Sequence, residues 1–145
     1  MLNQDFKEFF QFLNESKVQY LIVGGYAVAF HGQPRYTKDI DVWVEISQEN
    51  AARIVEAIAL FGLSSPDLQP PDFLAPDRII QIGYEPSRID LLTTIPGVDF
   101  AECYPVRVTA EVDGVKVDFI DLNNLKKNKR ASGRHQDLAD IEKLE

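Results

Sequence analysis

The chain has 145 residues and a net charge of −8, with 45% of its residues hydrophobic and 26% charged. This length suits one globular domain over residues 1–145 with a core of its own, and the acidic balance argues against a uniformly basic nucleic-acid surface. No apolar stretch approaches the roughly 20 residues of a membrane span, the N-terminus lacks the basic segment of a signal peptide, and a single cysteine excludes an internal disulfide. These features predict a cytoplasmic location and no membrane partner.

Hydrophobic spacing predicts an alternation of helices and strands in the first half of the chain. The expected elements are a helix over about 3–16, a strand over 18–23, a short helix over 25–32, a loop over 33–38, a strand over 39–46 and a helix over 48–62. Ser47 is suited to cap the last of these helices, and Gly62 is suited to end it.

The second half begins with a proline-rich segment, residues 63–77, which predicts a loop. The elements expected after it are strands over 78–84 and 88–94, a helical turn over 97–103, a hairpin of 106–112 and 115–122 around Asp113-Gly114, and helices over 123–129 and 135–145. This order predicts an α/β (α+β) fold, a mixed β-sheet flanked by helices rather than a regular βαβ array.

Two carboxylates, Asp39 and Asp41, open the strand over 39–46. Side chains alternate along a strand, so both point to one face, about 7 Å apart. At that distance they repel one another, and a divalent cation would relieve the repulsion because hard cations prefer oxygen ligands. Taken alone, the same spacing is also typical of a solvent-exposed strand face.

A glycine pair, Gly24-Gly25, lies between the first strand and the short helix that follows it. Glycines there let backbone N–H groups approach a phosphate, and a helix N-terminus favours anions; the same pair also makes a tight turn. The spacing does not match a dinucleotide-binding fingerprint. The carboxylates open their strand instead of ending it, which argues against an aspartyl-phosphate phosphatase.

The run Val23-Gly24-Gly25, thirteen residues, then Asp39-Ile40-Asp41-Val42 resembles the signature of the polymerase-β-like nucleotidyltransferase superfamily. That family needs a third acid on a nearby strand, and Asp90 in "RIDLLTT" suits it. The resemblance covers about residues 18–94. It is strongest to the small stand-alone prokaryotic members, which include abortive-infection, toxin–antitoxin and antibiotic-modifying transferases. "GRHQDLADIEKL" also resembles the closing helix of that subgroup.

The resemblance implies transfer of a nucleoside monophosphate from an NTP, such as ATP, to an acceptor hydroxyl, with release of pyrophosphate. Asp39, Asp41 and Asp90 would be the catalytic residues and would hold Mg²⁺, and two ions are expected. Gly24 and Gly25 would hold the phosphates of the nucleotide. The alternative is a catalytically silent nucleotide- or partner-binding module of the same fold, for example within a toxin–antitoxin pair.

Four basic residues are further candidates for nucleotide binding: Arg35, Lys38, Lys127 and Arg134. Arg35 and Lys38 are equally well explained as loop cations that balance the acids. The basic segment 126–134 suits a local polyanion site, but it also suits a helix end. The acceptor stays open between a small molecule such as a cationic antibiotic, a tRNA end and a protein, and a partner subunit or antitoxin is a further expected partner.

Several residues of chemically versatile types have a structural interpretation. Trp43 shares the face of Asp41 by strand parity, and we expect core packing for it rather than stacking on a base. Cys103 is expected to be a small core residue. The others are expected at helix ends or in the hairpin: His31, His135, Asp118 and Asp121.

Overall fold

The computed structural model describes residues 2–32, 39–62 and 68–144, so the loop predicted over 33–38 lies outside the described residues, and so do Arg35 and Lys38. The helices are α1 (Gln4–Glu15), α2 (Gly24–His31), α3 (Gln48–Phe61), α4 (Phe100–Cys103), α5 (Leu122–Ser132) and α6 (His135–Leu144), with two 3-10 helices, η1 (Pro70–Phe73) and η2 (Tyr104–Val106). The strands are β1 (Tyr20–Val23), β2 (Ile40–Val44), β3 (Ile79–Ile82), β4 (Ile89–Leu92), β5 (Val108–Val112) and β6 (Val115–Phe119).

The strands form one mixed sheet in the order β3-β4-β2-β1-β6-β5. At its centre β1 pairs antiparallel with β2 and parallel with β6, while β2 runs parallel to β4. The hairpins β3–β4 and β5–β6 form the two ends of the sheet. The predicted mixed sheet is confirmed, and the strands that carry Asp41 and Asp90 are parallel neighbours.

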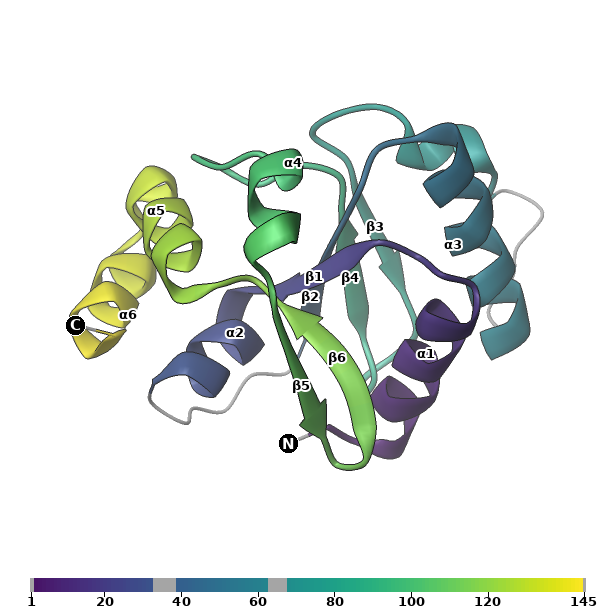
Figure 1. Cartoon of the computed structure of the whole chain (residues 1–145), viewed down its shortest axis with the longest axis horizontal. Coiled ribbons are helices and arrows are strands. Elements are labelled where there is room, and N and C mark those ends of the chain that lie inside the picture. Colours follow the sequence, from purple (N-terminus) through teal and green to yellow (C-terminus); the bar gives the residue numbers. More distant parts are fainter. Residues whose placement is uncertain (1, 33–38, 63–67, 145) are drawn as a thin grey trace.

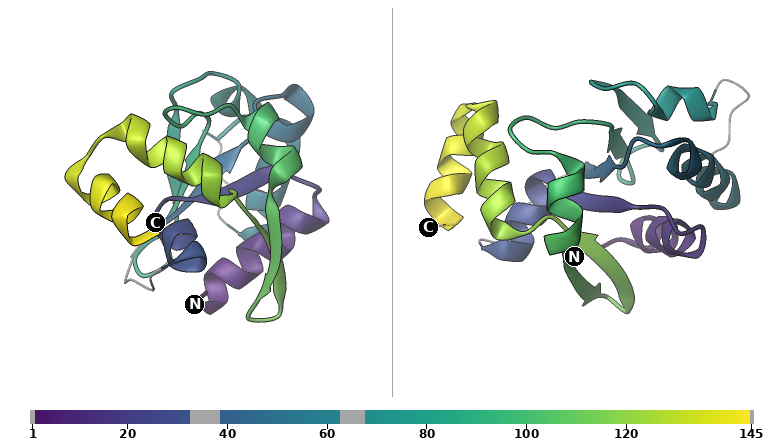
Figure 2. Two further views of the ribbon diagram at one scale, coloured as in Figure 1. Left: turned by 60° about the vertical axis from the view of Figure 1, so that its left-hand side comes forward. Right: turned by 45° about the horizontal axis from the view of Figure 1, so that its top comes forward.

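Helices cover both faces of the sheet. Figures 1 and 2 show α1 and α3 close together, and α5 and α6 close together near α2. Helix α2 also contacts α1, since the ring centroids of Phe6 and Tyr26 lie 5.9 Å apart. The apolar residues of α1 are fully buried at helical spacing: Phe6, Phe9, Phe10 and Leu13. Burying a side chain of this size contributes roughly 1.5–3 kcal/mol. The side with α1 and α3 is therefore packed core.

Helix α2 is fixed to β6 at the end away from its glycines. The ring of Phe30 stacks on Phe119 with centroids 4.1 Å apart, and Nε2 of His31 donates to the carbonyl oxygen of Ile120 at 2.7 Å. His31 is thus a satisfied polar group, as predicted. These contacts set the direction of α2, whose first turn lies at the end of β1.

Most local predictions are confirmed. Ser47 caps α3 by accepting from the backbone N–H of Asn50, and Gly62 ends it in a left-handed conformation. Trp43 and Cys103 are buried, and Asp121 caps α5. Several bounds differ: β2 begins at Ile40, after Asp39, η1 lies within the predicted loop over 63–77, η2 ends at Val106, where a strand is predicted, and α5 is longer than the predicted 123–129. No helix among the described residues is long and apolar enough to cross a membrane.

Candidate functional site

The site begins where β1 passes into α2. Gly24 has φ +66°, a left-handed conformation that side chains rarely adopt. A Cβ atom at Gly24 would overlap Oδ2 of Asp41, because Val23 is paired with Asp41 across the two strands. A glycine is therefore needed here for the backbone conformation and also for the close approach of the carboxylate.

The carboxylates of Asp41 and Asp90 lie side by side. The two residues are direct partners in the parallel register of β2 and β4, so their side chains share one face. Both line a pocket of about 840 Å³ that Gly24 also lines. Asp39 lies just before β2 and is half-buried, but it is not part of the pocket lining. The structure thus brings Asp41, Asp90 and Gly24 together, with Asp39 at the start of the same strand.

Placing the carboxylates of Asp41 and Asp90 close together in a partly buried position raises the free energy of their charged forms. Burial, and to a smaller extent the charge of the neighbouring Asp90, raise the pKa of Asp41 to about 6, while the charge of Lys129 opposes the change. Burial and the charge of Asp39 likewise raise the pKa of Asp90, against Arg88 and a hydrogen bond from Gln81. Oδ1 of Asp90 is buried and has no hydrogen-bond partner among the described residues. A proton or a cation would relieve this cost.

The donor set fits a hard divalent cation such as Mg²⁺. Among the described residues, no group of three His, Cys, Asp or Glu side chains is placed to surround a metal ion. Mg²⁺ sites in nucleotide-dependent enzymes, however, commonly use one or two carboxylates, with phosphates and water as the other ligands. Paired carboxylates on adjacent strands suit that kind of site, because one of them has a buried oxygen without a hydrogen-bond partner among the described residues.

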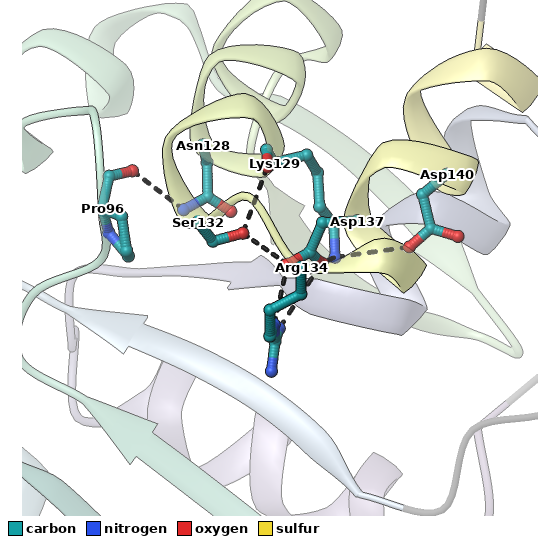
Figure 3. Close-up of polar contacts among 7 residues, drawn as sticks. All are labelled: Pro96, Asn128, Lys129, Ser132, Arg134, Asp137 and Asp140. Atoms are coloured by element: carbon teal, nitrogen blue, oxygen red, sulfur yellow. Dashed lines mark hydrogen bonds and ion pairs between the residues drawn. The ribbon is translucent and has the colours of Figure 1, made fainter.

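The opposite wall of the pocket comes from α5 and α6. Lys129 is 5% exposed, and its Nζ lies 2.9 Å from Oδ1 of Asp137 and 3.5 Å from Oδ2 of Asp140. Nε of Arg134 donates to Asp137 at 2.8 Å, and the hydroxyl of Ser132 donates to the same carboxylate. Figure 3 shows Asp137 between the two basic side chains, with Asp140 one turn further along α6. Asp137 therefore restrains the side chains of Lys129 and Arg134, and Asp140 restrains Lys129 further.

Asp137 is charged in this setting. Burial raises the pKa of its carboxyl, but the hydrogen bonds from Arg134, Ser132 and Lys129 outweigh burial and hold the pKa well below its usual range. The wall is also tied to the segment after β4, because the Nδ2 of Asn128 donates to the carbonyl oxygen of Pro96 at 2.9 Å.

The pocket carries four carboxylates and three cations. The acids in its lining are Asp41, Asp77, Asp90 and Asp137, and the basic residues are Arg78, Lys129 and Arg134. Lys129 and Arg134 act on the charge of Asp41, which places positive charge near the carboxylates. Arg134 therefore lies beside the carboxylates, and its predicted nucleotide contact stays a prediction.

Lys127 lies elsewhere. It is exposed and lines a second pocket of about 370 Å³, which shares Thr94 and Ile95 with the first. Sequence analysis missed the buried residue of the same helix, Lys129, and its partners Asp137 and Asp140. A signal was available, because Lys129 follows the buried Leu125 by four positions and Asp137 precedes the buried Ile141 by four.

Comparisons with known proteins identify the fold. No family model matches the chain, and no curated protein matches its sequence. A Thermotoga maritima protein to which nucleotidyltransferase activity has been ascribed is 17% identical, with a TM-score of 0.63 over 95% of this chain and 88% of its own. ANT(2")-Ia, solved in complex with adenylyl-2"-tobramycin, is 11% identical, with a TM-score of 0.57 over 96% of this chain and 84% of its own.

A third solved structure, an antigenic nucleotidyltransferase-like protein from Paracoccidioides brasiliensis, is 15% identical, with a TM-score of 0.55 over 99% of this chain and 75% of its own. At these identities the likeness concerns the fold. The chain has the nucleotidyltransferase fold, as the glycine pair and the spaced acids predict.

Proposed function

We propose that the chain is a Mg²⁺-dependent nucleotidyltransferase that moves a nucleoside monophosphate from an NTP to an acceptor hydroxyl. The observation that carries the proposal is the pairing of Asp41 and Asp90 on adjacent parallel strands, in one pocket with Gly24 and two cations. The fold supports it, since its solved neighbours are named as nucleotidyltransferases or as nucleotidyltransferase-like.

Asp39, Asp41 and Asp90 are the residues that would hold Mg²⁺. Three carboxylates, with Asp41 and Asp90 directly opposite each other in the register of β2 and β4, suit two ions. When bound, Mg²⁺ neutralises the triphosphate and makes the acceptor hydroxyl more acidic. The backbone N–H groups at Gly24 and Gly25, in the first turn of α2, would bind phosphate oxygens. The catalytic contribution of the chain is then largely alignment and charge stabilisation.

On the opposite wall, Lys129 and Arg134 would contact the triphosphate. Their partner Asp137 fixes both side chains before the nucleotide arrives, so little conformational entropy is lost on binding. Arg35 and Lys38 remain proposals for additional phosphate contacts from the segment before β2. Lys127 would contact a nucleotide only through the second pocket.

In the reaction, the acceptor oxygen forms a bond to the α-phosphorus of the NTP. The bond from that phosphorus to the oxygen bridging to the β-phosphate breaks, and pyrophosphate leaves with the electron pair. Oδ1 of Asp90 is buried without a hydrogen-bond partner among the described residues, and it would accept the proton of the hydroxyl.

The decisive experiment measures pyrophosphate release and label transfer from each NTP with Mg²⁺ present. The acceptor panel contains total cell RNA, a protein extract and aminoglycosides, because the acidic chain suits a cationic acceptor and its basic segment suits RNA. Asp41→Ala and Asp90→Ala should each lower the rate by at least about a hundredfold, since loss of a metal ligand costs several kcal/mol of barrier and each 1.4 kcal/mol is about tenfold.

Glu111→Ala is the matched control, because Glu111 is an exposed acid of β5. It should keep the wild-type rate. Wild-type rates in folded Asp41→Ala or Asp90→Ala would refute the site. NTP binding without pyrophosphate release across the whole panel would instead favour the silent nucleotide- or partner-binding module.

A further inference from the structure

The wall of the pocket formed by α5 carries a buried amide side chain, that of Asn128. Asn128 is 8% exposed and lines the pocket, directly before Lys129 in the chain. Its Nδ2 donates to the carbonyl oxygen of Pro96 at 2.9 Å, a bond that Figure 3 shows. Because a carbonyl oxygen only accepts, this bond fixes which end of the amide faces Pro96. The other end, Oδ1, is an acceptor, and it has no hydrogen-bond partner in the part of the chain that the structure describes.

Close packing around the amide holds it in place. Gly97 has φ +82°, and a Cβ atom there would lie 2.5 Å from Cβ of Ala131 on α5. Helix α5 and the segment after β4 are therefore in direct contact beside Asn128. An acceptor that is already oriented binds a donor with little loss of conformational entropy. A bound ligand that offers it no donor loses affinity, because the buried oxygen has then given up water without compensation.

A second acceptor lies one helical turn further along α5. Ser132 lines the same pocket four positions after Asn128, and side chains at this spacing share a face, with Cβ atoms about 5–6 Å apart. The hydroxyl of Ser132 donates to the carboxylate of Asp137, and it lies 3.2 Å from the carbonyl oxygen of Lys129. Both neighbours are acceptors, so they use the single hydroxyl hydrogen and leave Oγ able to accept from a ligand.

We propose that Asn128 and Ser132 recognise the ribose of the donor nucleotide, so that the chain selects ribonucleotides over deoxyribonucleotides. The inference rests on the proposed function, in which Lys129 and Arg134 contact the triphosphate. The ribose follows the α-phosphate directly, and its 2′- and 3′-hydroxyls are neighbouring donors. A hydroxyl donates over about 2.7 Å, so two hydroxyls placed between the side chains reach both acceptors. One would donate to Oδ1 of Asn128 and the other to Oγ of Ser132.

The position of the two acceptors favours the ribose over the nucleobase. Asn128 directly precedes Lys129, and Ser132 shares the carboxylate of Asp137 with Lys129 and Arg134, so both acceptors border the side chains that would hold the phosphates. The ribose lies nearer to the phosphates than the base does. Nucleobase edges also carry acceptors among their donors, and an acceptor of the base would be repelled by either side chain.

The experiment measures by calorimetry the affinity of the chain for each NTP and for its 2′-deoxy and 3′-deoxy counterparts. Mg²⁺ is present and no acceptor is added, so the readout does not depend on turnover. The wild type should bind the ribonucleotide at least about tenfold more tightly than either deoxy form, because each missing hydroxyl leaves one buried acceptor without a donor.

Asn128→Ala and Ser132→Ala should each remove the discrimination against one deoxy form, and the two variants should affect different forms. A merely structural role would weaken the binding of all three nucleotides by the same factor and leave their ratios unchanged. Asn123→Ala is the matched control, since Asn123 is an exposed asparagine of the same helix outside the pocket lining, and it should keep the wild-type ratios. If Asn128→Ala does not fold after losing its bond to Pro96, the wild-type comparison and Ser132→Ala decide.

Equal affinities of the wild type for ribonucleotides and both deoxy forms would overturn the inference and leave the proposed function standing. Discrimination that persists in both folded variants would overturn the assignment to Asn128 and Ser132. A changed preference among the four bases in Asn128→Ala, with unchanged ratios between ribose and deoxyribose, would mean that the amide contacts the base instead. Absence of binding of every nucleotide, with no transfer to any acceptor, would mean that the proposed function has failed, and this inference with it.

Discussion

Replacing Lys129 by methionine tests whether the buried charges between α5 and α6 act as a unit. Lys129 is 5% exposed, and its partners Asp137 and Asp140 are 1% and 0% exposed. Removing one member of a buried ion pair typically costs about 3–5 kcal/mol, because the remaining charge stays buried. Asp137 keeps its bonds from Arg134 and Ser132 in this variant, so we expect the lower end, about 3 kcal/mol.

The measurement is urea unfolding of the wild type and Lys129→Met, followed by a titration with a fluorescent NTP analogue. For a chain of this size, 3 kcal/mol corresponds to a drop in Tm of about 9 °C. Lys127→Met is the matched control, since Lys127 is exposed two positions earlier on α5 and should change the free energy of unfolding by less than about 0.5 kcal/mol. Equal losses in the two variants would refute the reasoning, because burial would then not distinguish the two lysines.

Three further predictions concern the carboxylate side of the pocket. Gly24→Ala should destabilise the fold and abolish NTP binding, because the new Cβ overlaps Asp41, whereas Gly62→Ala, with φ +94° and open space around it, should cost only about 1 kcal/mol in unfolding experiments. The pKa of Asp41 lies above its unfolded value of 3.8, so in EDTA the folded state binds more protons than the unfolded state. The free energy of unfolding should therefore fall as pH rises from about 4 to about 6. Asp41→Asn should flatten that pH dependence, and an unchanged slope in this variant would contradict the assignment to Asp41. Mg²⁺ with NTP should raise the Tm of the wild type but not of Asp41→Asn, as measured by thermal shift.

The local part of the site was predictable from sequence. Gly24 predicts a turn, and the alternating residues over 39–46 predict a strand with its two acids on one face. The sequence also predicts Asp90 on a nearby strand. The pairing itself was not predictable, because β2 and β4 are distant in the chain and their parallel register depends on the whole sheet. Register places Asp90 beside Asp41. Asp39 lies before β2 and is not in the pocket lining.

The basic wall was harder to predict. Lysines are almost never fully buried, so composition favours a solvated face for a Lys-rich helix. Lys127 and Lys129 are two positions apart, which turns one outward and the other inward on the same helix. Asp137 and Asp140 reach Lys129 only because α6 folds back on α5, an arrangement that depends on tertiary packing rather than on local sequence.

The balance of acidic and basic side chains in the pocket affects which ligands it binds weakly. Its three cations are outnumbered by four carboxylates, and Asp137 already occupies two of those cations. A polyanion without a bound cation is therefore repelled by Asp41 and Asp90, and little attraction from the basic residues offsets this repulsion. Each contact between like charges near 4 Å costs roughly 1–4 kcal/mol. Inorganic phosphate and nucleotides without a bound cation should compete poorly with cation-bound nucleotides for the pocket. The pocket therefore selects ligands whose negative charge is neutralised before they bind.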